Sequence, residues 1–186
     1  MQYAIELYYD KETENKLFAP AKSIADRKIS TKFLEWKTRP HLTLACFNDV
    51  DETRCIEQLK SFSQNHERMS AYIGSVGMFC DTKTIFVSPV MNSRMYQFHR
   101  ELHEQFRDFD TNGWEWYCPD RWVPHCTIAL TREDEKEAFF QASDIILRTF
   151  EKMSGQFTSL GLVKIIFPVK EIYSVELSDD TAGRNE

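Results

Sequence analysis

Hydrophobic and polar residues follow two periods along the chain, and these periods predict an alternation of strands and helices. Alternating or wholly apolar runs of strand length occur seven times, and helical spacing occurs four times. The predicted strands are Tyr3–Tyr9, Pro40–Phe47, Met69–Cys80, Thr84–Val90, Val123–Leu130, Phe157–Phe167 and Glu171–Leu177. The predicted helices are Lys11–Ile29, Asp51–Asn65, Ser93–Asp108 and Glu133–Phe150. Sequential hairpins with helices between them favour an α+β fold over a doubly wound parallel sheet.

A short segment around a Pro-His pair recurs 84 residues later, as Pro40-His41-Leu42-Thr43-Leu44 and Pro124-His125-Cys126-Thr127-Ile128. Two further matches keep the same displacement: Glu67–Ser70 with Glu151–Ser154, and Ser75–Gly77 with Ser159–Gly161. Three matches in one register indicate two related halves. We therefore expect a bilobal, two-fold pseudo-symmetric domain of antiparallel sheets with flanking helices, and an active-site cleft between the lobes.

Each copy of this segment contains a histidine followed two residues later by a threonine. Residues i and i+2 of a strand point to the same face, so His41 projects with Thr43, and His125 with Thr127. If a pseudo-two-fold axis relates the halves, both pairs converge on one cleft. One neutral imidazole could then accept a proton while the other, charged, donates one, since the ordinary pKa of histidine is about 6.5. The threonine hydroxyls could donate hydrogen bonds to phosphate oxygens. The pattern predicts phosphodiester chemistry.

The two motifs, each followed by an apolar residue (Leu44 or Ile128), resemble the hallmark of the two-histidine phosphoesterase superfamily. That superfamily includes RNA 2′,3′-cyclic phosphodiesterases and 2′-5′ RNA ligase-like proteins, and its bilobal α+β architecture agrees with the predicted order of elements. The resemblance implies a metal-independent enzyme that acts on 2′,3′-cyclic or 2′-5′ linked phosphodiesters, by hydrolysis or the reverse ligation. It also implies that the histidines act as acid and base and that the threonines contact the phosphate. Sequence symmetry leaves open which histidine is the acid.

Residues next to the motifs are candidates for substrate binding. If strand parity persists past the prolines, Arg39 and Arg121 lie on the faces of His41 and His125, where a guanidinium could hold phosphate oxygens. Solvated arginines at the ends of strands are the alternative. Trp122 and the aromatic loop before it (Trp114, Trp116 and Tyr117) could stack a nucleobase, or they could cover the hydrophobic core.

The composition is that of one globular domain, which we expect to span residues 1–178, with a polar tail at 179–186. The chain has 186 residues, of which 42% are hydrophobic, and a formal net charge of −6. Because this charge provides no large basic surface, we expect a nucleotide or an RNA end as the substrate and no duplex DNA.

The five cysteines show no close pairing, which suits a reducing cytoplasm. No apolar run is long enough to span a membrane. We expect a monomer without a cofactor or a metal.

Other interpretations compete with this one. His99 and His103 lie on one helical face, but Arg100 stands where a zinc-protease pattern requires glutamate, so we favour an exposed polar helix face. Cys126 adjoins His125, yet neighbouring strand residues point apart and cannot form a nucleophile–base pair. A single His-x-Thr would suit a structural strand position, and only the repeated pair favours catalysis. A nucleotide- or RNA-end-binding module without turnover would use the same four motif residues, so it stays open.

Overall fold

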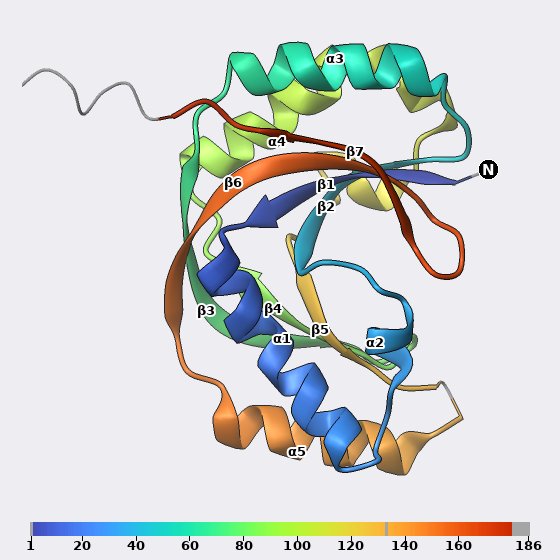
Figure 1. The fold of residues 1–186 in the computed structure, drawn as a ribbon, viewed down its shortest axis with the longest axis vertical. Coiled ribbons are helices and arrows are strands. Elements are labelled where there is room, and N and C mark those ends of the chain that lie inside the picture. Colours follow the sequence, from blue (N-terminus) through green and yellow to red (C-terminus); the bar gives the residue numbers. More distant parts are fainter. Residues whose placement is uncertain (1, 133, 180–186) are drawn as a thin grey trace, which may run out of the picture.

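The structure, a computed structural model, describes residues 2–132 and 134–179, so the expected polar tail lies outside the described residues except for Asp179. Strands and helices alternate along this part of the chain (Figure 1). The strands are β1 (Tyr3–Tyr9), β2 (His41–Phe47), β3 (Met69–Phe79), β4 (Thr84–Pro89), β5 (Cys126–Leu130), β6 (Met153–Lys164) and β7 (Lys170–Glu176). The helices are α1 (Lys11–Asp26), α2 (Lys32–Glu35), α3 (Glu52–Gln64), α4 (Ser93–Gln105) and α5 (Lys136–Thr149), with 3-10 turns η1 (Arg107–Asn112) and η2 (Glu115–Tyr117). Within the described residues, α2 is the one α-helix that the periodicity does not predict.

These strands form a single antiparallel sheet in the order β2-β1-β6-β3-β4-β5, and β7 is also paired with β6. The long strand β6 joins the two parts of the sheet, because residues 153–157 pair with β3 while residues 157–164 pair with β1. The sheet curves strongly along β6 (Figure 1), and its edge strands β2 and β5 contact each other. The two expected halves thus share one sheet instead of forming separate sheets.

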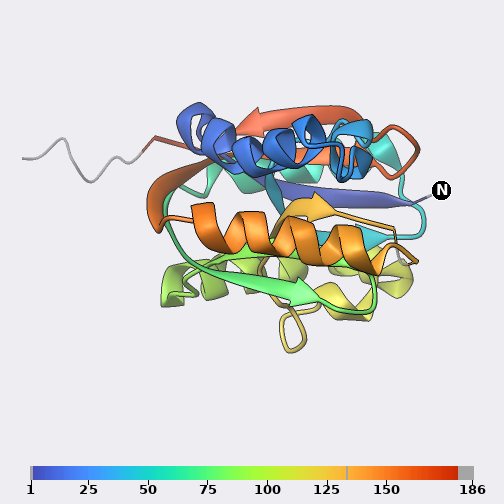
Figure 2. The ribbon, with the colours of Figure 1, turned by 90° about the horizontal axis from the view of Figure 1, so that it is seen from below.

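Helices cover the curved sheet in two pairs at opposite ends of the molecule (Figure 1). Helices α3 and α4 pack together over β7 and β2, whereas α1 and α5 pack together and α1 covers β5. Figure 2 shows α1 and α5 side by side. Between the layers, the residues that alternate with the motif residues are buried as expected: Leu42, Leu44, Cys126 and Ile128. Among the described residues, none of the helices has the length and apolarity needed to cross a membrane.

The order of elements agrees with the sequence repeat. Helices α3 and α5 begin 84 residues apart, as do strands β3 and β6. The two His-x-Thr segments fall on β2 and at the start of β5, which are the two ends of the strand order. This correspondence is consistent with two related halves.

Two glycines related by the repeat make room for aromatic rings on the neighbouring strands. A Cβ atom added at Gly77 would lie 2.4 Å from the ring of Phe86, and one added at Gly161 would lie 2.3 Å from the hydroxyl oxygen of Tyr8. Phe86 in turn contacts the ring of His125, and Tyr8 is the cross-strand partner of His41. The glycine of each repeat therefore allows an aromatic ring to lie close to the sheet next to a motif histidine.

We expect Gly77→Ala to lower the free energy of unfolding by about 1–3 kcal/mol, because the new methyl group must displace the packed Phe86 ring. Gly74→Ala on the same strand is a matched control, since its methyl group would meet two exposed side chains, Tyr72 at 3.2 Å and Val90 at 3.8 Å. Both substitutions lower the conformational entropy of the unfolded chain equally, so this contribution to stability cancels when the two variants are compared. Urea unfolding measures the difference. Equal stability of the two variants would contradict this account of Gly77.

Candidate active site

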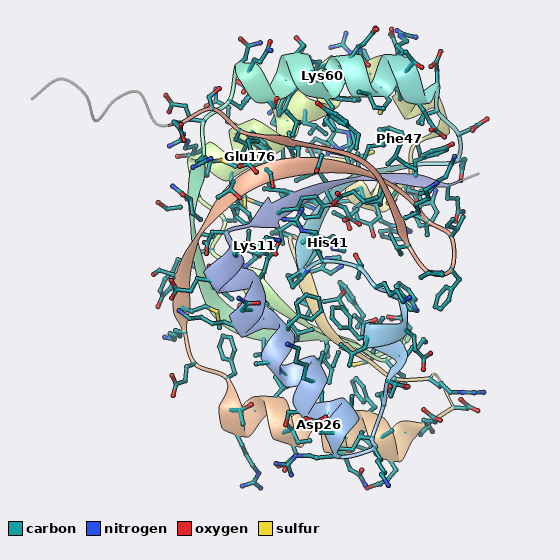
Figure 3. All side chains as sticks on the ribbon, in the orientation of Figure 1. Lys11, Asp26, His41, Phe47, Lys60 and Glu176 are labelled. Atoms are coloured by element: carbon teal, nitrogen blue, oxygen red, sulfur yellow. The ribbon has the colours of Figure 1, made fainter. Side chains whose placement is uncertain are left out.

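Both His-x-Thr motifs lie where the two edge strands of the sheet meet. His41 is the first residue of β2, and His125 immediately precedes β5. Figure 3 shows His41 near the middle of the molecule, close to the start of α1. The charge of His41 contributes to lowering the pKa of His125, so the two imidazoles lie near enough to interact electrostatically. Folding therefore brings together two motifs that are 84 residues apart in the chain.

The two imidazoles are oriented in the same way. Nδ1 of His41 lies 2.6 Å from the carbonyl oxygen of Arg39, and Nδ1 of His125 lies 2.7 Å from that of Val123. A carbonyl oxygen only accepts hydrogen bonds, so each Nδ1 carries a hydrogen and donates it. In the neutral form of either ring Nε2 is then unprotonated, which makes Nε2 the atom that can gain or release a proton.

The two threonines extend this face of the sheet. Thr43 and Thr127 are half-buried, as are His41 and His125. Thr43 is the cross-strand partner of Glu6 on β1, and Thr127 is the cross-strand partner of Phe86 on β4. Direct cross-strand partners project to the same face of a sheet. Glu6 and Phe86 therefore stand next to the motif residues in their respective halves.

Glu6 is a residue of this site that the sequence analysis missed. Its Oε1 atom lies 3.3 Å from Nε2 of His41, and the residue is only 4% exposed. Burial raises the pKa of the Glu6 carboxyl, while His41 and the Tyr8 hydroxyl act in the opposite direction. The available signal was an acidic residue in the middle of β1, a strand in which every residue is buried.

His125 has aromatic neighbours where His41 has a carboxylate. The ring of Phe79 meets it edge-on with a centroid distance of 4.9 Å, and the Phe86 centroid is 5.3 Å away. Burial lowers the pKa of His125, and the hydrogen bond to the Val123 carbonyl oxygen partly opposes this shift. Two identically oriented histidines thus differ in their electrostatic surroundings.

Arg39 lies next to His41, but carboxylates already hold its guanidinium group. Nε and Nη2 donate to Glu14 at 2.9 and 2.6 Å, and Nη1 lies 3.5 Å from Glu171. The guanidinium carbon also lies 3.9 Å from the centroid of the Tyr8 ring. The side chain of Arg39 is 30% exposed, so it could still contact a phosphate. Its guanidinium group would then be shared between the phosphate and these carboxylates.

Arg121 was expected at the site from strand parity, but β5 begins only at Cys126, so this parity does not extend back to it. Trp122 was expected next to the second motif as an aromatic that could stack a nucleobase. Arg121 is exposed and forms an ion pair with Glu115 at 2.6 Å. Trp122 is 9% exposed and stacks on His99, with centroids 3.8 Å apart. Its indole nitrogen donates to the carbonyl oxygen of Thr43 at 2.9 Å. Trp122 therefore supports β2 from within the core, where a nucleobase cannot stack on it.

The aromatic loop before β5 also covers hydrophobic residues. Trp114 and Tyr117 are half-buried and pack against a small cluster that includes Cys46. Trp116, in contrast, is 66% exposed and lies near the guanidinium group of Arg121.

His99 and His103 are core residues, and the expectation of an exposed helix face was wrong. Their Nε2 atoms lie 2.9 and 3.1 Å from the same acceptor, the carbonyl oxygen of Leu44. Burial lowers the pKa of His99 to about 4. In the part of the chain that the structure describes, no group of three or more His, Cys, Asp or Glu residues is placed to hold a metal ion. Burial also raises the pKa of Cys126 to about 12, so its thiol stays protonated near neutral pH.

Surface hollows occur elsewhere on the molecule. One lies between α1 and α5 and is lined in part by Arg27 and Phe140, and another next to α2 is lined in part by Lys32 and Phe167. Neither hollow includes a motif residue. The candidate site is therefore defined by its converging side chains and coincides with neither hollow.

Comparisons with known proteins identify the family and agree with the fold. The family model described as the 2′-5′ RNA ligase superfamily matches residues 16–165. No curated protein matches the chain in sequence. Solved structures match its fold at low identity, which confirms the expected α+β class with an antiparallel sheet and flanking helices. E. coli LigT complexed with NADP+ is 13% identical over 96% of this chain and 98% of that one, with a TM-score of 0.57. TT0787 of Thermus thermophilus is 14% identical over 97% of this chain and 100% of that one, with a TM-score of 0.64.

We expect the imidazole of His125 to lose its proton below the ordinary histidine value of about 6.5, because burial disfavours the charged form. Phe79→Ala should move this titration toward the ordinary value by opening one side of the ring to water. Phe140→Ala removes an exposed phenylalanine on α5 and should leave the titration unchanged. NMR detection of the imidazole signals against pH provides the measurement. A wild-type midpoint at or above the ordinary value would refute the expectation.

Proposed function

Because the chain belongs to the 2′-5′ RNA ligase superfamily, we propose that it is a metal-independent phosphodiesterase for 2′,3′-cyclic or 2′-5′ linked nucleotide or RNA phosphodiesters. The observation that carries this proposal is the pair of histidines at the meeting edges of the sheet. Each is held through Nδ1, which leaves Nε2 of His41 and Nε2 of His125 as the atoms that exchange protons. The reaction is hydrolysis, or ligation when it runs in reverse.

One neutral imidazole and one imidazolium are sufficient for the proton transfers. Nε2 of the neutral ring accepts a proton from the attacking water as the water oxygen forms its bond to phosphorus. The charged ring gives its Nε2 proton to the ribose oxygen as the bond between that oxygen and phosphorus breaks. After one turnover the two rings have exchanged their protonation states, and proton exchange with solvent restores the starting arrangement.

Charge that develops on the non-bridging phosphate oxygens requires hydrogen-bond donors. Thr43 and Thr127 are placed on the same face as the histidines, and their hydroxyls are the donors that we propose. Arg39 adds positive charge next to His41, although Glu14 and Glu171 compete for it. We assign no substrate contact to Arg121 or Trp122.

One relative in fold supports a nucleotide as the substrate. E. coli LigT has been crystallised with ATP and with 3′-AMP as well as with NADP+. The net charge of −6 on the present chain disfavours a long nucleic acid track. We propose a small nucleotide or an RNA end, processed by a single domain within residues 1–178 that acts as a cytoplasmic monomer.

We expect His41→Ala and His125→Ala each to lower the single-turnover rate by about 10²–10⁴-fold, because each removes one partner of the proton transfer. His66→Ala is the matched control, since that histidine contacts Glu101 and Phe62 instead of the motif residues. Wild-type rates in either motif variant would exclude the proposal.

The same experiment separates catalysis from binding. A panel of 2′,3′-cyclic nucleotides and 2′-5′ linked oligonucleotides is offered to wild type and to the double variant His41→Ala/His125→Ala. Turnover by wild type alone establishes the reaction class. Binding of a nucleotide by wild type without any turnover would favour the alternative, a nucleotide- or RNA-end-binding module.

We expect activity to persist in EDTA and to follow a bell-shaped pH profile, because the proposed reaction needs one neutral and one charged histidine. Rates are measured with and without chelator across the pH range. Loss of activity on chelation, restored by added zinc or magnesium, would overturn the metal-free mechanism.

A further inference from the structure

The carbonyl group that orients the ring of His41 belongs to a residue whose side chain is held by an ion pair. Nδ1 of His41 lies 2.6 Å from the backbone carbonyl oxygen of Arg39. The guanidinium group of the same Arg39 donates from Nε and Nη2 to Oε1 of Glu14, at 2.9 and 2.6 Å. Glu14, in the first turn of α1, is thus linked to the imidazole through one residue.

Glu14 is a buried acid near a helix end that is fixed to the sheet. Its side chain is 6% exposed. The N-cap residue Asp10 accepts hydrogen bonds from the backbone amide of Thr13 at 2.9 Å and from that of Gln156, on β6, at 2.7 Å. A Cβ atom added at Gly155 would lie 2.1 Å from the hydroxyl oxygen of Thr13, so the first turn packs directly against β6. The carboxylate of Glu14 therefore has a fixed place relative to the sheet.

The side chain of Arg39 has little freedom to move. Its guanidinium carbon lies 3.9 Å from the centroid of the Tyr8 ring, and Tyr8 is the cross-strand partner of His41. Nη1 lies 3.5 Å from Glu171. A buried ion pair contributes little to stability compared with apolar residues of similar size, because both charges lose their hydration. Fixing the position of Arg39 is therefore the better account of the pair than stability.

The position of the Arg39 carbonyl group determines which nitrogen of a neutral His41 ring carries the hydrogen. A carbonyl oxygen only accepts, so it favours a hydrogen on Nδ1. The hydroxyl of the buried Thr38 lies 3.3 Å from the same Nδ1, and a hydroxyl can also donate. In the structure this hydroxyl can donate instead to the carbonyl oxygen of Arg39, at 3.4 Å. If the carbonyl group moved away, Thr38 could donate to Nδ1, and the hydrogen would then lie on Nε2.

The ring of the second motif is held in another way. Nδ1 of His125 lies 2.7 Å from the carbonyl oxygen of Val123, whose side chain is apolar and 48% exposed. A valine side chain forms no ion pair, and the rings of Phe79 and Phe86 pack against the imidazole instead. His125 is therefore an internal comparison for any change made at Glu14.

We infer that Glu14 is a positioning residue for His41: through Arg39 it holds the carbonyl group that keeps the hydrogen on Nδ1 and leaves Nε2 free to exchange a proton. The consequence for catalysis rests on the proposed function, whereas the orientation of the ring does not. The inference is the same whether His41 accepts or donates the proton, because both roles need Nε2 to face the phosphodiester. Glu14 itself acts only through Arg39.

Glu14→Gln keeps the shape of the side chain and removes its charge. We expect the neutral His41 ring of this variant to carry its hydrogen partly on Nε2, because the carbonyl group of Arg39 is no longer held in place. Nitrogen NMR of protein with ¹⁵N-labelled histidine distinguishes the two tautomers, at an alkaline pH where the titration of both motif rings is complete. His125, observed in the same spectrum, should stay unchanged. A His41 ring that keeps its hydrogen on Nδ1 in this variant would overturn the inference.

Glu12→Gln is the matched control. Both acids lie in the first turn of α1, so each substitution removes the same favourable interaction with the helix dipole. Glu12 is exposed and pairs with Lys16 instead of Arg39. We expect this variant to retain the wild-type tautomer of His41 and the wild-type rate. An equal change in Glu12→Gln and Glu14→Gln would show that the Arg39 contact is not the cause.

A double variant separates positioning from a general loss of stability. Glu14→Gln leaves a charged Arg39 without its main partner, whereas Glu14→Gln/Arg39→Gln removes both charges and should recover much of the stability in urea unfolding. We expect kcat to stay about 10- to 100-fold below wild type in both variants, because a misplaced imidazole lowers it. In Glu14→Gln KM should not rise, since Arg39 is still present near the phosphate. Recovery of kcat together with stability in the double variant would assign the pair a structural role only.

The NMR result does not depend on the reaction. The expected change of tautomer, in a protein that turns over no phosphodiester, would support the positioning of His41 by Glu14 and refute only the proposed reaction. An unchanged tautomer in an active enzyme would refute the inference and leave the proposed function in place.

Discussion

The site depends on the curvature of one antiparallel sheet, because that curvature brings its two edge strands together. An edge strand normally exposes unpaired carbonyl and amide groups. Here β2 meets β5, and the free carbonyl groups of β2 accept hydrogen bonds from residues outside the sheet: the indole of Trp122 binds Thr43, and the backbone amide of Trp114 binds Cys46. His99 and His103 both bind the carbonyl oxygen of Leu44. The edge that carries His41 is therefore fixed along most of its length.

The carbonyl groups of β2 need hydrogen-bond donors, and this need explains why several residues of types common in active sites have structural roles here. Trp122 was a candidate for base stacking, and the pair His99 and His103 was a candidate for metal binding. All three are buried, and each donates a ring N–H to a carbonyl oxygen of β2. Sequence periodicity cannot predict these structural roles. They depend on which loop and which helix pack against β2, and the edge at β2 forms only when strands distant in the sequence pair.

The sequence predicted the strands and long helices because their apolar residues are periodic and their turns are short. It also predicted the pairing of His41 with His125, since two strand motifs at one repeat displacement imply matched places in two halves. It did not predict that the halves share one sheet, because the length over which β6 pairs with both β1 and β3 depends on tertiary contacts. It missed Glu6 because a lone acid in an apolar strand has no motif, and only the register of β1 against β2 places that carboxylate next to His41.

The charges around the site match a ligand with few negative charges. Arg39 is balanced by Glu14 and Glu171, and the carboxyl group of Glu6 lies 3.3 Å from Nε2 of His41. A long nucleic acid is bound through many uncompensated cations, which release counterions from successive phosphates. A single phosphodiester instead needs hydrogen-bond donors at one point, and the threonine hydroxyls can provide them.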